Sequence, residues 1–218
     1  MTENTRTPIS LDALDLAALL ASRVCHDVIN PVGAIVNGLE LLDEGPDAST
    51  RDMAIDMIKK SAGMAAARLK FARIAFGAAG SAGSAIDTRD AQSVAVGFLN
   101  DDRTTVEWNI PAAYLPKNRV KLLLNLVLIG VGAIPRGGVV RVDPLGDGDT
   151  MGFLITVTGL NVRLPPHAAD LVAGIPVNEQ GSIDAHAVQP YYTGVLARAA
   201  GITVTMAHDG ERFVLRAV

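Results

Sequence analysis

The fold of this chain follows from LDLAALLASRVCHDVINPVGAIVNGLELL, residues 14–42. Apolar side chains recur through this stretch at alternating spacings of four and three residues. The positions are Leu14, Ala18, Ala21, Cys25, Val28, Val32, Ile35, Leu39 and Leu42. This heptad pattern is typical of the seam of a helical bundle or coiled coil. Because Gly45-Pro46 follows, we predict one long helix over residues 11–44.

A second amphipathic helix follows after a few residues. Ser49 and Asp52 have the spacing of a capping box, which predicts the helix start. The apolar stripe of this helix consists of Ile55, Ile58, Ala62, Ala65, Leu69, Ala72 and Phe76. Gly77, Gly80 and Gly83 are expected to end the helix and to form a flexible joint. The two helices therefore form an antiparallel hairpin.

Each seam is narrow, so one hairpin alone buries little apolar surface. Two such hairpins commonly pair into a four-helix bundle. We therefore predict a homodimer. The alternative is that both helices pack against the C-terminal domain of their own chain.

The remainder of the chain alternates between helix and strand patterns. The expected helices cover 87–99, 116–134 and 191–200, and the expected strands cover 104–110, 139–142, 153–157, 202–207 and 213–218. These elements predict an α+β fold with mixed or antiparallel strands, covered by helices on one face. We predict a helical-hairpin domain over residues 1–80 and an α/β domain over residues 84–218.

Composition excludes several classes of protein. The chain has 218 residues, a net charge of −4 and only 4% aromatic residues, so nucleic-acid binding is not expected. A single cysteine, Cys25, excludes an intramolecular disulfide framework. No signal peptide or run of about 20 apolar residues is evident, which predicts a cytoplasmic protein without a membrane span. The dispersed histidines predict no metal site, and the loop 146–152 is interpreted as a turn.

His26 stands out because it lies one residue past a seam position and should project sideways from the bundle. Asp27 follows directly, and Asn30 lies one helical turn further on. Pro31 lies inside the predicted helix, where proline costs about 3 kcal/mol. On these facts alone, a surface histidine beside a chance proline remains the alternative.

The segment SRVCHDVINPV, residues 22–32, resembles the phosphoacceptor box of sensor histidine kinases. In that box, a histidine is followed by an acidic residue and, five positions on, by a proline. The resemblance implies that His26 lies on the first helix of a dimeric four-helix bundle. It also implies a following domain with the layout of the kinase ATP-binding domain.

The second half departs from the kinases at the residues that bind nucleotide. Ile129 occupies the position of the asparagine that holds Mg²⁺, and Ile129 cannot coordinate a metal. Gly159, Asn161 and Arg163 replace the adenine-binding aspartate and two glycines. Residues 186–192, HAVQPYY, replace the glycine-rich lid. Three losses suggest a domain kept for shape or for protein contact.

A kinase-like dimer without an ATP site resembles the ChpT-type histidine phosphotransferases of bacterial phosphorelays. The resemblance implies that His26 takes a phosphoryl group from the receiver domain of a hybrid histidine kinase. His26 then passes this group to the aspartate of a response regulator, with Mg²⁺ supplied by the receiver and no cofactor of its own. Asp27 would orient the ring or stabilise its other N–H group, or alternatively be a solvated carboxylate on the helix surface. Asn30 would position a water, or alternatively fill the proline kink.

Receiver docking is expected below His26, on a face shared by the two helices. Gly33 would allow close approach, and Met57 and Met64 would form an adaptable apolar patch, unless they are buried in the bundle. Arg23 and Asn37 complete this predicted docking set. Two rival functions stay open: an active sensor-type kinase with divergent ATP boxes, and a non-catalytic scaffold for receiver domains.

Overall fold

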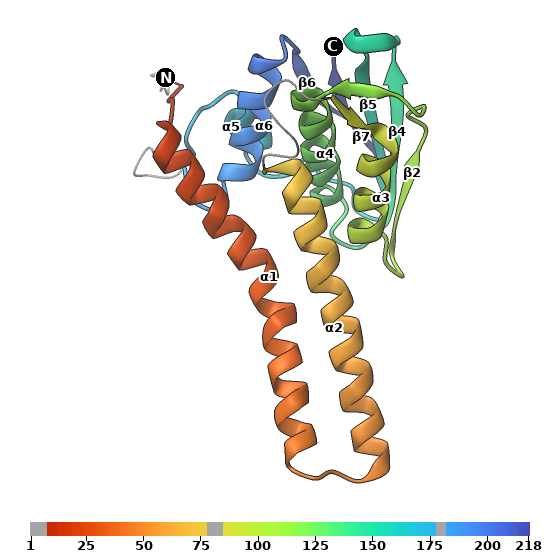
Figure 1. The fold of residues 1–218 in the computed structure, drawn as a ribbon. Coiled ribbons are helices and arrows are strands. Elements are labelled where there is room, and N and C mark those ends of the chain that lie inside the picture. Colours follow the sequence, from red (N-terminus) through yellow and green to blue (C-terminus); the bar gives the residue numbers. More distant parts are fainter. Residues whose placement is uncertain (1–7, 78–84, 178–181) are drawn as a thin grey trace.

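The computed structural model describes residues 8–77, 85–177 and 182–218. Helices α1 (Ala13–Asp43) and α2 (Ala48–Ala75) form the predicted antiparallel hairpin (Figure 1). The carboxylate of Asp12 caps α1 by accepting hydrogen bonds from the N–H groups of Leu14 and Asp15, both at 2.8 Å.

The predicted start of the second helix is wrong by two residues, because Asp47 and not Ser49 is the N-cap. The carboxylate of Asp47 accepts a hydrogen bond of 3.0 Å from the N–H of Thr50. This bond satisfies one of the unpaired N–H groups of the first turn and lowers the pKa of Asp47. Ser49 therefore lies inside the helix, and its pairing with Asp52 does not mark the start.

Small residues allow the two helices to approach closely. The buried residues of the hairpin interior are Pro31, Gly38, Ala54, Ser61 and Ala65. A Cβ atom on Gly38 would lie 2.6 Å from the side chain of Ile58 in α2.

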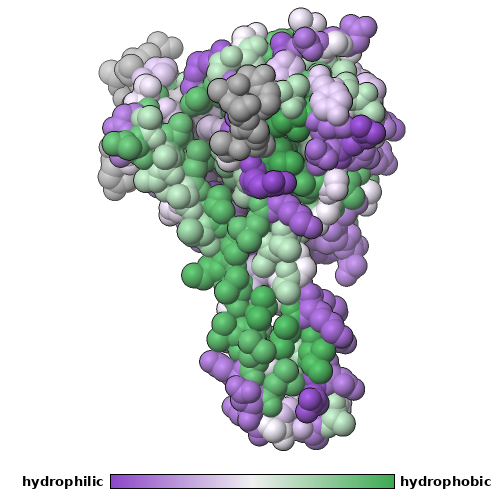
Figure 2. Space-filling view, in the orientation of Figure 1, coloured by the Kyte–Doolittle hydropathy of each residue, from purple (hydrophilic) through white to green (hydrophobic). Residues whose placement is uncertain are grey.

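Several predicted seam residues lie outside this interior. Leu14, Val32, Leu39 and Leu69 are between 44% and 82% exposed in the single chain. Figure 2 shows an extended hydrophobic surface along both helices of the hairpin. Most of the apolar seam is therefore unpartnered within one copy of the chain.

The α/β domain contains a mixed five-stranded sheet, as predicted. Its strands are β2 (Thr104–Trp108), β4 (Gly138–Leu145), β5 (Gly152–Gly159), β6 (Val204–Asp209) and β7 (Arg212–Ala217). They are arranged in the order β2-β4-β5-β7-β6, and the β2–β4 pair is parallel while the others are antiparallel. The loop 146–152 is a turn with a single 3-10 turn at Gly148–Thr150, which confirms its interpretation.

The helices of this domain lie on one side of the sheet (Figure 1). They are α3 (Thr88–Leu99), α4 (Lys117–Gly132), α5 (Ala168–Val172) and α6 (Val188–Ala199). Helix α4 is the centre of the core, since Gly130 brings its backbone against Val140, Ile155 and Val157 of the sheet. The predicted elements missed α5 and the two-stranded pair β1 (Ala85–Asp87) and β3 (Tyr114–Pro116). These elements have three to five residues, too few to show a periodic pattern.

Both ends of the hairpin are attached to the α/β domain. Asn125 of α4 donates a hydrogen bond of 3.1 Å to the carbonyl of Ala75 at the end of α2. Just before α1, the N–H of Leu11 donates to the hydroxyl of Tyr191 in α6 at 2.8 Å. The two helices therefore pack against the α/β domain of their own chain at these ends, as the alternative to a homodimer supposed. The tip of the hairpin projects beyond that domain (Figure 1). Gly80, Gly83 and the predicted domain boundary lie outside the described residues.

Helix α1 has the length and the apolar composition of a helix that could cross a membrane. This is weak evidence, because the unpartnered seam of a bundle helix has the same composition. The same helix also carries the charged pair Arg23 and Asp27.

Candidate functional site

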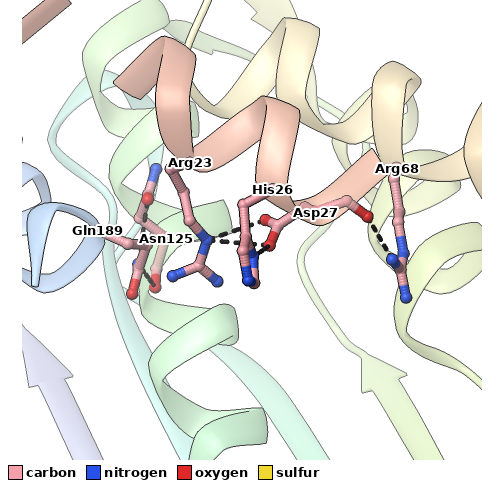
Figure 3. Close-up of polar contacts among 6 residues, drawn as sticks. All are labelled: Arg23, His26, Asp27, Arg68, Asn125 and Gln189. Atoms are coloured by element: carbon pink, nitrogen blue, oxygen red, sulfur yellow. Dashed lines mark hydrogen bonds and ion pairs between the residues drawn. The ribbon is translucent and has the colours of Figure 1, made fainter. Parts of the chain in front are cut away.

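His26 projects from the middle of α1, and its side chain is 60% exposed (Figure 3). Its Nδ1 atom lies 3.5 Å from Oδ1 of Asp27, at the long end of hydrogen-bond range. A carboxylate accepts from an N–H group, so we place the ring proton on Nδ1. The Nε2 atom then keeps a free lone pair and can act as a nucleophile.

Asp27 is itself held by a second side chain of α1. Nε of Arg23 donates to both carboxylate oxygens of Asp27, at 3.1 Å and 3.0 Å. Arg23 was predicted to dock a partner, which stays a prediction; in the structure its side chain orients Asp27. The four-residue spacing of this pair is a signal that sequence reasoning could have used. Arg23, His26 and Asp27 project from the same side of α1 in Figure 3.

The proline of the motif has a direct structural consequence at Asp27. In an uninterrupted helix, the N–H of residue 31 would bond to the carbonyl of residue 27. Pro31 has no N–H, so the carbonyl of Asp27 lacks its helical partner. Nη1 of Arg68, reaching across from α2, donates to this carbonyl (Figure 3). Figure 1 shows α1 bending near the middle of its length, as expected at an internal proline.

Arg68 links the site to the α/β domain as well. Its guanidinium carbon lies 5.9 Å from the ring centroid of Phe98 in α3. Sequence reasoning missed Arg68. The available signal was the unpaired carbonyl that a proline creates four residues earlier, which requires a donor from another element.

The remaining predicted residues of α1 are open to solvent. Asn30 and Asn37 are exposed, and a Cβ atom on Gly33 would meet no other atom within 4 Å. Within the described residues, no hydrogen bond of the Asn30 side chain is found. Arg68, and not Asn30, pairs with the backbone group that the kink frees. Both interpretations of Asn30, positioning a water and filling the kink, stay predictions.

Met57 and Met64 are 37% and 48% exposed in the single chain. The Cε atom of Met57 lies close to Gly38 of α1, so this side chain borders the contact between the two helices. Both methionines are therefore accessible in one copy of the chain, as an adaptable docking patch requires.

The α/β domain also contributes a residue to the surroundings of His26. The ring of His186, in the turn before α6, lies edge-to-face with the ring of His26 at a centroid distance of 5.4 Å. Sequence reasoning placed His186 in a degenerate lid, because residues so far apart in the chain give no local signal of contact.

The positions that bind nucleotide in kinases have other roles in this chain. Ile129 is only 3% exposed and belongs to the hydrophobic core. The N–H of Arg163 donates to the carbonyl of Ala133 at 3.0 Å, which holds that segment against the end of α4. Gln189, in the predicted lid replacement, is buried in the first turn of α6. Its amide donates to the carbonyl and side-chain oxygens of Asn125, at 3.0 Å and 3.1 Å (Figure 3).

Comparison with known proteins agrees with this architecture. Residues 88–212 match the family model of the histidine phosphotransferase C-terminal domain. An exposed histidine on a two-helix hairpin, followed by this domain, defines the class, and the chain belongs to the histidine phosphotransferase family.

The particular relatives are similar over nearly their whole length. The chain is 52% identical to the protein phosphotransferase ChpT of Brucella abortus (strain 2308), over 96% of this chain and 98% of that protein. A solved structure of a bacterial phosphotransferase superposes with a TM-score of 0.88 at 50% identity, covering 97% of this chain and 99% of the other. The predicted resemblance to ChpT-type phosphotransferases is confirmed.

Proposed function

We propose that this chain carries phosphoryl groups between receiver domains, with His26 as the phosphoacceptor and without use of ATP. The observation that carries the proposal is the arrangement of His26. Its Nδ1 faces a carboxylate fixed by Arg23, and its ring is mostly exposed to solvent. A partner can therefore reach Nε2 while the opposite edge of the ring is oriented.

In the first transfer, the lone pair of His26 Nε2 attacks the phosphorus of an aspartyl phosphate on the donor receiver. The N–P bond forms as the O–P bond breaks, and the electron pair of that bond returns to the donor's carboxylate. The imidazole ring gains positive charge in this step and keeps its Nδ1 proton. Asp27 stabilises the charged ring, as a carboxylate does in other histidine-dependent transfers.

The second transfer reverses these bond changes toward another receiver. A carboxylate oxygen of the response regulator attacks the phosphorus, and the N–P bond breaks with its electron pair returning to Nε2. The ring leaves as neutral imidazole because Nδ1 has kept its proton. Mg²⁺ held by the receiver would neutralise the negative charge of the phosphoryl oxygens in both steps.

The exposed seam supports a homodimer that completes a four-helix bundle. Val32 and Leu39 lie one heptad apart on α1, and Leu69 of α2 lines an apolar groove with Cys25. A second copy of this hairpin would cover such a surface with matching side chains. Gly33, Met57 and Met64 would then remain uncovered and accessible for receiver docking. We place the protein in the cytoplasm, where receiver domains are available.

The structure of the α/β domain supports transfer without ATP. The side chain at the magnesium-binding position, Ile129, is buried in the core and offers no ligand. Asn125 bonds to Gln189 and to the end of α2, so it serves packing. We infer that this domain supports the hairpin and contacts partners.

The experiment is to mix the purified protein with a radiolabelled, phosphorylated receiver domain and to follow the label. The wild type should acquire acid-labile label, and His26→Ala should acquire none while its circular dichroism spectrum is unchanged. His208→Ala, an exposed histidine on β6, is the matched control. Label on His26→Ala at the wild-type rate would refute the proposal, and absence of label on the wild type would favour a scaffold.

A second arm replaces the receiver with radiolabelled ATP and Mg²⁺. No label should reach His26, and calorimetry at physiological salt should detect no saturable site tighter than about 100 µM, equivalent to roughly 5.5 kcal/mol of binding free energy. Label from ATP alone would make the chain an active kinase.

A further inference from the structure

His186 is the residue of the α/β domain whose ring contacts the ring of His26. The two rings come from segments 160 residues apart and meet edge-to-face at 5.4 Å between centroids. Both residues are exposed, so the contact is not sealed in a core. A phosphoryl group on Nε2 can therefore enter the space around both rings.

The backbone that carries His186 is firmly placed. The carboxylate of Asp184 accepts hydrogen bonds of 2.9 Å from the N–H groups of His186 and Ala187, forming an Asx turn before α6. Helix α6 is in turn held at two points. Its buried residue Gln189 bonds to Asn125 of α4, and the hydroxyl of its residue Tyr191 accepts a hydrogen bond from Leu11, just before α1. The position of the His186 backbone relative to α1 is therefore set by contacts with both domains.

The nearby cations are already committed to other groups. Arg23 pairs with the carboxylate of Asp27, and Arg68 donates to the backbone carbonyl of Asp27. Within residues 8–77, 85–177 and 182–218, neither ring nitrogen of His186 makes a hydrogen bond. Its N–H group is thus available beside His26.

A phosphoryl group on His26 would need such a donor. The group carries negative charge on its oxygens, and the carboxylate of Asp27, at the opposite edge of the ring, offers them no donor. Hydrogen bonds aimed at the oxygens of a transferring phosphoryl group stabilise the transition state. The exposed ring of His186, with its centroid 5.4 Å from that of His26, carries an N–H group that can reach this space.

We propose that His186 is a second catalytic histidine, whose ring N–H donates a hydrogen bond to a phosphoryl oxygen carried by His26. This inference rests on the proposed function and adds a residue of the α/β domain to the transfer site. The bonds that form and break are those described above, and His186 keeps its proton throughout.

The test compares His186→Ala with His186→Gln, which keeps an N–H donor of similar reach. Transfer from a phosphorylated receiver is measured at saturating receiver, and receiver affinity is measured separately by calorimetry. His186→Ala should lower the saturated rate by about tenfold, the effect of losing one hydrogen bond, with receiver affinity unchanged. His186→Gln should recover most of the rate, and His208→Ala should match the wild type.

A second readout examines the phosphorylated protein after the receiver is removed. The ³¹P resonance of phosphorylated His26 should shift in His186→Ala, because a donor to the phosphoryl oxygens is lost. An unchanged rate, an equal loss in both His186 variants, or a loss confined to receiver affinity would overturn the inference. A wild type that takes no label would instead refute the proposed function, so the two failures are distinguishable.

Discussion

The hydrogen bond between Arg68 and the backbone of Asp27 should exist because Pro31 removes the helical partner of that carbonyl. Arg68→Ala should therefore be destabilising in the wild type and much less so in a Pro31→Ala background. In that background, the backbone regains an N–H at position 31, which can bond to the carbonyl of Asp27 within the helix. The prediction concerns the interaction energy between two substitutions, which a double-mutant cycle measures.

The structure sets the expected size of this interaction energy. A hydrogen bond from a charged donor contributes about 1.5–3 kcal/mol. Arg68 is partly exposed, so we expect about 1–2 kcal/mol, around and below the lower limit of that range. The contact of Arg68 with Phe98, about 0.5–1 kcal/mol, is lost in both backgrounds and cancels in the cycle.

The measurement is urea unfolding of the four proteins, followed by circular dichroism at one fixed protein concentration. A fixed concentration is needed because association of copies would shift the apparent stability. The reasoning is refuted if Arg68→Ala costs the same in both backgrounds within about 0.5 kcal/mol. Equal cost would mean that Arg68 acts through Phe98 or through general packing.

Four further predictions concern other parts of the molecule. Gly33→Trp should block phosphoryl transfer in a labelling assay while leaving the far-ultraviolet spectrum unchanged, since the site has open space for a side chain; unchanged transfer would place receiver docking elsewhere. Leu69→Glu should give monomers or aggregates in sedimentation experiments, because the seam would bury a charge; a wild type of single-chain mass at micromolar concentration would contradict the bundle. Tyr191→Phe should lower the free energy of unfolding by about 1–2 kcal/mol, because the N–H of Leu11 loses its acceptor; no change in the urea midpoint would show that this bond is dispensable. Burial, with a smaller contribution from a neighbouring lysine, lowers the pKa of Lys121 below 10.5. Just below pH 10.5 the unfolded chain therefore binds more protons than the folded chain, so the free energy of unfolding should rise with pH relative to that of Lys121→Met. A difference between the two proteins that does not change with pH in urea unfolding would show that Lys121 is not desolvated.

Long periodic patterns predicted the hairpin and the α/β domain well. The heptads of residues 14–42 and 55–76 fixed two helices, and strand alternation located β2, β4, β5, β6 and β7 to within a few residues. The helix start at Asp47 was missed because two neighbouring residues offer plausible caps, and the choice depends on which oxygen reaches the N–H of Thr50. The pair β1 and β3 was missed because each strand has only three residues, too few to show an alternating pattern.

The candidate site was predictable only where its residues are close in sequence. His26, Asp27 and Pro31 form one motif, and their helical positions followed from the heptad. Arg68 and His186 reach His26 and its neighbour from α2 and from the turn before α6, and only the tertiary structure brings them there. Local spacing therefore identified the proposed nucleophile, while the surroundings of His26 depended on contacts across the fold.

The attachment of both hairpin ends to the α/β domain has a consequence for the encounter with partners. Asn125 holds the end of α2, and Tyr191 holds the start of α1. In the proposed function, an incoming receiver would therefore meet a preorganised surface, and its binding would cost the host little conformational entropy. A small interface would then be enough to orient the receiver against His26, so even a short-lived complex could transfer the phosphoryl group. Such brief encounters would suit the proposed carrier, which must release one partner before it meets the next.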